Sequence, residues 1–185
     1  PGGVIGPNDP HCGDGMDIII DIINGRYNPM IKAHFPLVDV RDLAVLHVKL
    51  MESGKGARRY FLSGDRVLFT GLIDKISELT GRRIRFFILP SWLIELPVRL
   101  IDLLSPFLPF RIPVTLEGFR FAKWDPVFDD SKTTNELKIS LRPYSETLSD
   151  TIKWLHSIGK INDDQEGKLS KDSYIKFILV HYQGC

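Results

Sequence analysis

Apolar residues follow two periods along the chain, and together they predict helices that alternate with strands. Residues 14–24, DGMDIIIDIIN, place apolar side chains at helical spacing and stop at Gly25, a residue suited to the position after a helix. Residues 35–40, FPLVDV, are short and apolar, which predicts a strand. Residues 41–53, RDLAVLHVKLMES, return to helical spacing.

The same alternation continues along the rest of the chain. Residues 58–62 predict a strand in which Tyr60, Phe61 and Leu62 are buried on both faces, as in a parallel sheet. Further elements are expected as a helix capped by Thr70 and closed by Gly81, a strand over 82–88, a helix over 114–124, and a helix over 145–159 with Leu148, Ile152 and Leu155 inward. Strands alternating with helices predict an α/β protein with a parallel sheet.

The most apolar stretch covers residues 84–110. Glu95, Arg99 and Asp102 interrupt it, so it lacks the 18 or so consecutive apolar residues of a membrane span. We expect an amphipathic core helix whose apolar face consists of Trp92, Leu93, Leu96, Leu100, Leu103 and Leu104. Two other interpretations stay open, namely the wall of a pocket for an apolar substrate and a contact with a membrane surface.

Composition excludes several classes of protein. The chain has 185 residues, 43% of them hydrophobic and 25% charged, with a net charge of +1. Such a balance is typical of a globular domain and argues against nucleic-acid binding through bulk charge. The two cysteines, Cys12 and Cys185, do not form a disulfide framework, and no basic and apolar leader is visible. These features predict a cytoplasmic protein.

Motifs for catalysis or metal binding are absent from the sequence. There is no G-x-G-x-x-G, no P-loop, no G-x-S-x-G and no tyrosine followed four residues later by lysine. The five histidines never occur at metal-ligand spacing, so we expect no metal site and no catalytic residue. Asp39 and Asp42 have the spacing of a capping box at the start of the 41–53 helix, which is favoured over a catalytic carboxylate pair.

The order of several segments is more informative than any one motif. PGGVIGPNDP, PLVDVRDLAVLHVKLME, ARRYFLSGD, TGLIDKISELTGRR, LPSWL and FDDSKTTNELKIS follow one another. This order resembles the C-terminal half of the extended short-chain dehydrogenase/reductase family, especially its NAD-dependent epimerase/dehydratase and dihydroflavonol-reductase-like members. The resemblance covers about residues 1–159. Lys138 stands where relatives usually have glycine, and 160–185 do not resemble the family's ending.

The resemblance implies a fold and a division of the chain. It implies the C-terminal part of a doubly wound, parallel, Rossmann-type sheet with a mostly helical substrate-binding cap, and the N-terminal dinucleotide-binding half would be absent. Residues 1–66 would form the end of the nucleotide-binding sheet with interleaved cap segments, 67–159 the cap and closing helix, and 160–185 a divergent tail.

The resemblance also implies a role for the opening segment. Pro1, Gly2, Gly3 and Val4 would lie beside the nicotinamide end of NAD or NADP, where a backbone without Cβ atoms can approach a ligand. The alternative is a turn that needs only glycine and proline. The family's dinucleotide loop and Tyr-x-x-x-Lys precede this segment, so this chain alone is expected to be inactive and to bind neither NAD nor NADP.

Two functional hypotheses therefore remain open. The first is the substrate-binding portion of an NAD(P)-dependent oxidoreductase or epimerase, whose whole protein transfers a hydride at a carbinol or carbonyl carbon. The second is a non-catalytic remnant that binds a ligand or a partner. The expected partner is a small and preferably apolar substrate, with no nucleic acid and no transmembrane span, and an exposed sheet edge favours self-association.

Overall fold

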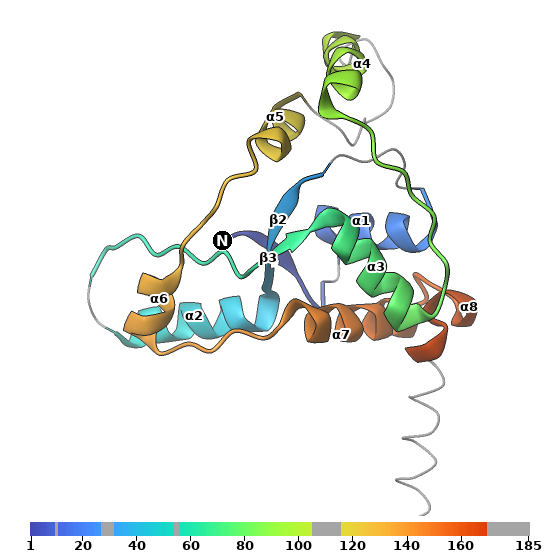
Figure 1. Cartoon of the computed structure of the whole chain (residues 1–185). Helices are drawn as coiled ribbons and strands as arrows, with labels where there is room; N and C mark the ends of the chain where they lie inside the picture. Colours follow the sequence, from blue (N-terminus) through green and yellow to red (C-terminus); the bar gives the residue numbers. More distant parts are fainter. Residues whose placement is uncertain (10, 27–31, 54–55, 105–115, 170–185) are drawn as a thin grey trace, which may run out of the picture.

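A three-stranded mixed sheet lies at the centre of the computed structural model (Figure 1), which describes residues 1–9, 11–26, 32–53, 56–104 and 116–169. The strands are β1 (Gly3–Ile5), β2 (His34–Asp39) and β3 (Asp65–Leu68), in the order β1-β2-β3. β1 pairs with β2 in parallel, whereas β2 pairs with β3 antiparallel. The fold is therefore α/β, but the expectation of a wholly parallel sheet is wrong for the described strands.

Two predicted strands are not strands in the structure, and β3 was not expected. Residues 58–62 are extended but are not part of the sheet. Among the described backbone hydrogen bonds, one joins them to the segment just before β1, from the Gly2 amide to the Leu62 carbonyl at 2.8 Å. Leu62 is buried as predicted, but Phe61 is 40% exposed. Residues 82–88 form a loop with one isolated bridge residue at its end. Apolar composition alone could not distinguish a paired strand from an extended segment with one neighbour.

Three helices build the main core against the sheet. They are α1 (Asp14–Ile23), α3 (Phe69–Thr80) and α7 (Tyr144–Ser157). The predicted inward positions of α7, namely Leu148, Ile152 and Leu155, are completely buried, which confirms the helical period there. A short helix, α8 (Asp163–Glu166), follows α7, and Ile161 and Leu169 on either side of it join the same core. The first part of the expected divergent tail is thus packed; residues 170–185 lie outside the described residues.

Of the two predicted helix caps, Asp39 is confirmed and Thr70 is wrong. α2 (Val40–Glu52) begins at its predicted cap, because the Asp39 side chain accepts a hydrogen bond from the Arg41 amide at 2.7 Å. The capping box is wrong, since the Asp42 carboxylate instead accepts from the Arg142 amide at 2.7 Å, a contact distant in sequence. Thr70 lies inside the first turn of α3, whose cap position is Leu68. Gly81 does close α3, with a φ of 70°.

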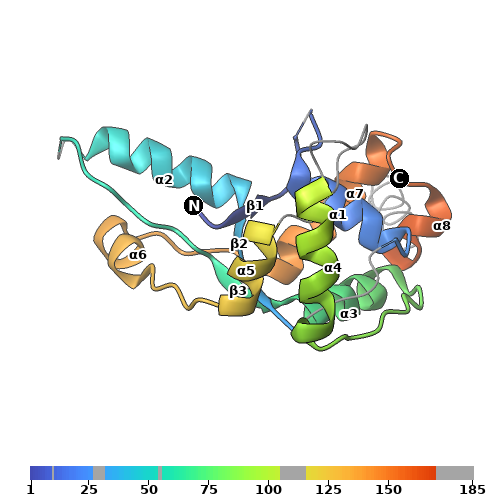
Figure 2. The same ribbon diagram turned by 90° about the horizontal axis from the view of Figure 1, so that it is seen from above.

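Within the apolar stretch, the one described helix belongs to a separate lobe rather than to the core. α4 (Ser91–Leu104) and α5 (Leu116–Trp124) contact each other and stand away from α2 and α7 (Figure 1), and Figure 2 shows the two helices side by side. We call these two helices the α4–α5 lobe. Only Val98 of α4 is buried, so the prediction that its apolar face lies in the core is wrong. The exposed members of that face are Trp92, Leu93, Leu96, Leu100, Leu103 and Leu104.

The polar positions of α4 behave as the sequence indicates. Arg99 donates to Glu95 one turn earlier at 2.6 Å, and Lys123 of α5 donates to the other Glu95 oxygen at 2.7 Å. This pair of contacts joins the two helices of the lobe. Among the described residues, no helix combines the length and the apolar character that crossing a bilayer would require.

Candidate functional site

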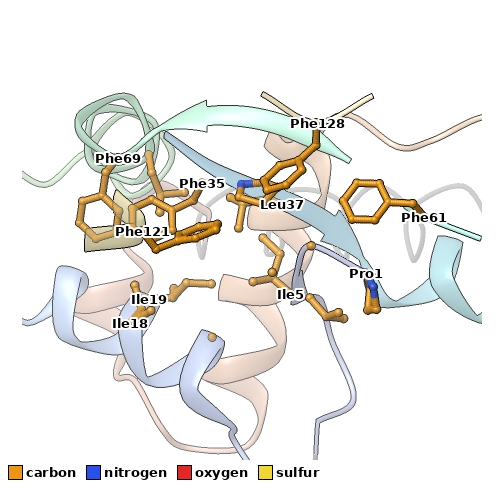
Figure 3. Close-up of a pocket in the computed structure, with 16 residues that line it drawn as sticks. Pro1, Ile5, Ile18, Ile19, Phe35, Leu37, Phe61, Phe69, Phe121 and Phe128 are labelled. Carbon is orange, nitrogen blue, oxygen red and sulfur yellow. The ribbon is translucent and has the colours of Figure 1, made fainter. Parts of the chain in front are cut away.

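An apolar cavity of about 530 Å³ lies where the N-terminal segment, α1, β2 and the chain after α5 meet. Its walls come from segments far apart in the sequence, and every described residue that lines it is apolar or glycine. Figure 3 shows Ile18 and Ile19 of α1 facing Phe35 and Leu37 of β2 across this space. The residues that line the cavity are Pro1, Gly2, Gly3, Val4, Ile5, Gly15, Ile18, Ile19, Phe35, Pro36, Leu37, Phe61, Phe69, Leu72, Phe121 and Phe128.

Five phenylalanines of the wall form two groups of contacting rings. The rings of Phe35 and Phe69 are tilted with centroids 5.0 Å apart, and those of Phe61 and Phe128 lie 5.3 Å apart. Phe121 stacks on Phe128 with centroids at 6.3 Å. The rings therefore give the wall an aromatic surface that has no hydrogen-bonding groups of its own.

The carboxylate of Asp125 connects the segment between α5 and α6 (Ser131–Leu137) to the sheet by hydrogen bonds. Asp125 accepts from the His34 amide at 3.1 Å and lies 3.0 Å from the His34 ring nitrogen Nδ1. Arg66 of β3 donates to the same carboxylate at 2.8 Å. Phe121 and Phe128 lie on either side of Asp125 in the sequence, so this contact positions both rings against the cavity.

The contacts of Asp125 with His34 and Arg66, which we call the Asp125 anchor, favour an ionised carboxylate. Loss of solvent contact acts to raise the pKa of Asp125, but the hydrogen bonds from His34 and the charges of His34 and Arg66 outweigh it. The pKa of Asp125 therefore lies below its ordinary value. The Asp125 anchor should persist at neutral pH, because the Asp125 carboxylate stays charged there.

Asp130 makes a second anchor in the same segment. Its carboxylate accepts hydrogen bonds from the Ser63 amide at 2.9 Å, from the Ser63 hydroxyl at 3.0 Å and from the Gly64 amide at 3.0 Å. These donors belong to the extended segment that precedes β3. In the sequence, Phe128 therefore lies between a carboxylate bound to β2 and β3 and another bound to the segment that precedes β3.

The predicted cofactor-adjacent residues are brought together at one end of the cavity. Pro1, Gly2, Gly3 and Val4 all line it. Gly2 also has a packing reason to lack a side chain, because a Cβ atom there would lie 2.6 Å from the Ser63 carbonyl oxygen. The structure brings the four residues to an apolar site, and their contact with a cofactor stays a prediction.

Two buried carboxylates elsewhere, Asp39 and Glu166, have structural partners. Burial acts to raise the pKa of Asp39, but hydrogen bonds from Arg41 and from the Thr147 hydroxyl outweigh it, so the pKa lies below its ordinary value. Burial raises the pKa of Glu166, whose carboxylate lies 2.9 Å from His156 Nδ1. No described group of three or more His, Cys, Asp or Glu residues could hold a metal ion.

Sequence reasoning missed most of this site. It named residues 1–4 but did not connect them with the five phenylalanines, which are spread from position 35 to position 128. The available signal was local: FPLVDV, RRYFLSGD and KWDPVFDD each place a phenylalanine in a segment that also resembles the family. Nothing in the spacing of these segments could show that their rings meet.

Comparison with known proteins gives the class of protein that this arrangement fits. No family model matches the chain. It is 26% identical over 168 residues to a protein of Synechocystis sp. named "Putative dihydroflavonol 4-reductase". It is also 24% identical over 163 residues to "Sterol demethylase protein B" of Methylococcus capsulatus. Each match covers 87% of this chain, and 48% and 50% of the respective relatives.

A solved structure supports the same fold. The crystal structure of gox2253 matches 88% of this chain and 49% of that protein, with a TM-score of 0.70 and 22% identity. The chain therefore spans about half the length of the relatives it matches. The resemblance to part of an extended short-chain dehydrogenase/reductase of the dihydroflavonol-reductase-like type is confirmed.

Proposed function

We propose that this chain is the substrate-binding portion of an NAD(P)-dependent oxidoreductase or epimerase of the extended short-chain dehydrogenase/reductase type. In the whole protein, the described sheet would continue into a doubly wound, mainly parallel sheet that carries the dinucleotide. The proposed reaction is hydride transfer between the nicotinamide and a carbinol or carbonyl carbon of the substrate. We further propose that the protein acts in the cytoplasm.

The apolar cavity carries this proposal. Its volume of about 530 Å³ falls within the usual range of about 300–1,000 Å³ for small-molecule sites. A wall of aromatic rings without charged side chains would bind a fused-ring or other flat apolar substrate by contact area and would leave the hydroxyls of a sugar nucleotide unpaired. A sterol-like or flavonoid-like substrate therefore fits better than a sugar nucleotide.

The residues at the end of the cavity fit only part of a cofactor site. Pro1, Gly2, Gly3 and Val4 could form an apolar wall beside a nicotinamide ring, and a bound cofactor would supply the hydride there. They offer no side chain for a phosphate or a ribose, and the described cavity lining has no acid or base to move a proton. We expect those groups to come from a preceding segment that encodes G-x-x-G-x-x-G and Y-x-x-x-K.

Ligand titration of the 185-residue chain tests the proposal. We expect a planar sterol or flavonoid ketone to bind in the micromolar range, and UDP-glucose, NADH and NADPH to show no measurable heat by isothermal titration. Phe128→Ala should weaken the apolar ligand several-fold because it removes one cavity wall, whereas Val127→Ala, a 77% exposed neighbour, should not. Binding of the sugar nucleotide in preference to the ketone would contradict the proposal.

A second candidate function rests on the chemistry of the cavity walls. The described lining is apolar or glycine throughout, so it could bind an apolar ligand without acting on it. A non-catalytic binding module is the alternative that this observation supports. Ketone turnover with NADH or NADPH, by a protein that also contains the segment encoded upstream of Pro1, would exclude the binding module. Tight ligand binding by that protein without turnover would favour the binding module.

A further inference from the structure

Glu166 is a buried acidic residue that takes no part in the candidate site. It is 3% exposed and lies in α8, in the part of the chain that does not resemble the family's ending. Its carboxylate lies 2.9 Å from His156 Nδ1, and the other ring nitrogen, Nε2, lies 2.6 Å from the Asp163 carboxylate. His156 belongs to α7, and α8 lies beside the end of that helix (Figure 1). We call His156, Asp163 and Glu166 the His156 cluster.

The geometry of the His156 cluster fixes how many protons it holds. A neutral imidazole has one N–H and one acceptor nitrogen, whereas an imidazolium has two N–H groups. The Asp163 side chain is 77% exposed and accepts from Nε2. If the ring is neutral, Nδ1 is then an acceptor and Glu166 must carry a proton. If the ring is charged, Nδ1 itself carries that proton. In both cases one proton lies between Nδ1 and the Glu166 carboxyl group.

Loss of this proton is unfavourable because Glu166 is buried. Whichever tautomer the neutral ring adopts, one of its nitrogens would then face a carboxylate with no hydrogen between them. Burial raises the pKa of Glu166, and the charge of Asp163 acts in the same direction. His156 and Lys153, both on α7, act to lower it without cancelling the effect of burial. The folded cluster therefore retains its proton at a pH where an exposed glutamate has lost it.

The His156 cluster lies where residues 161–169 pack on the core. The apolar residues on either side of α8 join the main core. Gly167 lies so close to the Thr80 carbonyl oxygen, at the end of α3, that a Cβ atom would have no room there. The contact with α1 is uncharged, because the Gln165 side chain donates to the Asn24 side chain at 2.6 Å. Among these described contacts, the His156 cluster is the one that titrates.

We propose that a proton shared by His156 and Glu166 fastens residues 161–169 to the core, and that these residues are released when the proton is lost as the pH rises. The sign follows from proton linkage. The folded-state pKa of Glu166 lies above its ordinary value of 4.5, so the stabilisation is fully present below about pH 4.5 and is lost as the pH rises through the folded value. Release would expose Ile161 and Leu169 to solvent.

Amide hydrogen exchange in the 185-residue chain tests this release. The amides of Glu166 and Gly167 donate to the carbonyls of Asn162 and Asp163 at 2.9 and 2.8 Å, so their protection reports a closed α8. After correction for the intrinsic exchange rate, this protection should fall by up to about tenfold per pH unit while the proton is lost, relative to amides in the middle of α7. Constant relative protection from about pH 4.5 to about pH 9 would overturn the proposal.

Glu166→Gln imitates the protonated carboxyl group, because its amide donates to Nδ1 and cannot ionise. At about pH 8 this variant should protect α8 several-fold more than the wild type does, with little dependence on pH. Asp164→Asn is the matched control, since Asp164 is an exposed carboxylate of the same helix, and it should keep the wild-type fall in protection. A fall retained in Glu166→Gln would contradict the assignment of the proton to this contact.

Two substitutions beside Glu166 test the same proton without changing the buried side chain. Asp163→Asn removes a charge that raises the pKa of Glu166, whereas Lys153→Gln removes one that lowers it. The fall in protection should therefore move to lower pH in the first variant and to higher pH in the second, by about half a pH unit each. Shifts in one common direction, or no shift in either variant, would indicate a packing contact alone and overturn the proposal.

Discussion

The two helices α7 and α4 have the same length and similar apolar periodicity, yet one is buried and the other is not. Leu148, Ile152 and Leu155 of α7 have no exposed surface, whereas Val98 is the sole buried residue of α4. α7 contacts β1, β2, α3 and α8, but among the described elements α4 has substantial contact only with α5. Periodicity therefore predicts a helix, while the neighbours of that helix decide whether its apolar face becomes core.

Substitutions in α7 and α4 should differ most in how far they lower the free energy of unfolding. Ile152→Ala should lower the free energy of unfolding by about 2–5 kcal/mol, because it opens a cavity in a packed interior. Leu103→Ala, at a position 70% exposed in α4, should change it by about 0.5 kcal/mol or less. Urea unfolding followed by circular dichroism measures both. A similar loss in the two variants would show that α4 is as tightly packed as α7.

A buried carboxylate on the core side gives the next effect. Asp39→Asn should cost about 1.5–3 kcal/mol at about pH 7, because the charged hydrogen bonds with Arg41 are lost. Since the folded-state pKa of Asp39 lies below 3.8, its stabilisation is present above that pH and disappears as the pH falls through the folded value. The difference between the wild type and Asp39→Asn should therefore shrink on acidification.

Urea unfolding at a series of pH values measures this dependence. Asp17→Asn, an exposed carboxylate on α1, is the control and should show no such convergence. A constant difference between the wild type and Asp39→Asn down to about pH 2 would contradict the assignment of the effect to this carboxylate.

Weaker effects are expected where the lobe joins the core. Asp125→Ala should remove the anchor to His34 and Arg66 and lower the affinity for an apolar fluorescent probe about threefold, because Phe121 and Phe128 lose their fixed positions. Asp129→Ala is the matched control, since its carboxylate accepts only from the nearby Ser131 amide among the described contacts. Equal loss in both variants would indicate general loosening of the segment between α5 and α6.

The smallest effect concerns the end of α6. Lys138 has a left-handed φ of 49°, a conformation that costs a residue with a Cβ more than it costs glycine. Lys138→Gly should raise the free energy of unfolding by about 0.5 kcal/mol, after allowing for the greater freedom of glycine in the unfolded chain. Lys132→Gly in the first turn of the same helix should instead lower it. Destabilisation by both substitutions would mean that Lys138 is not strained.

The sequence predicted those features that depend on local spacing. The helix over 14–24, the cap at Asp39, the end of α3 at Gly81 and the inward face of α7 are all confirmed. Each follows from contacts within one or two turns, or from a residue type that few other positions need.

Features that depend on distant partners were not predictable. The sheet is mixed because β2 pairs with β3 in the antiparallel sense. Asp42 does not complete the expected capping box, because its carboxylate accepts a hydrogen bond from Arg142, 100 residues away. The cavity likewise needs Phe35 and Phe128, which are far apart in the sequence, to line one space. Four residues of the candidate site were named from the family resemblance, and the aromatic wall could be identified only once the segments were placed in space.

The contact between His34 and Asp125, 91 positions apart, has a kinetic consequence. Joining such distant segments closes a long loop, and the entropy of loop closure delays contacts of this kind until shorter-range structure has formed. The aromatic wall should then be completed near the end of folding. An apolar dye that is captured only by the finished cavity would report that last event, after the helical signal of α7 has already recovered.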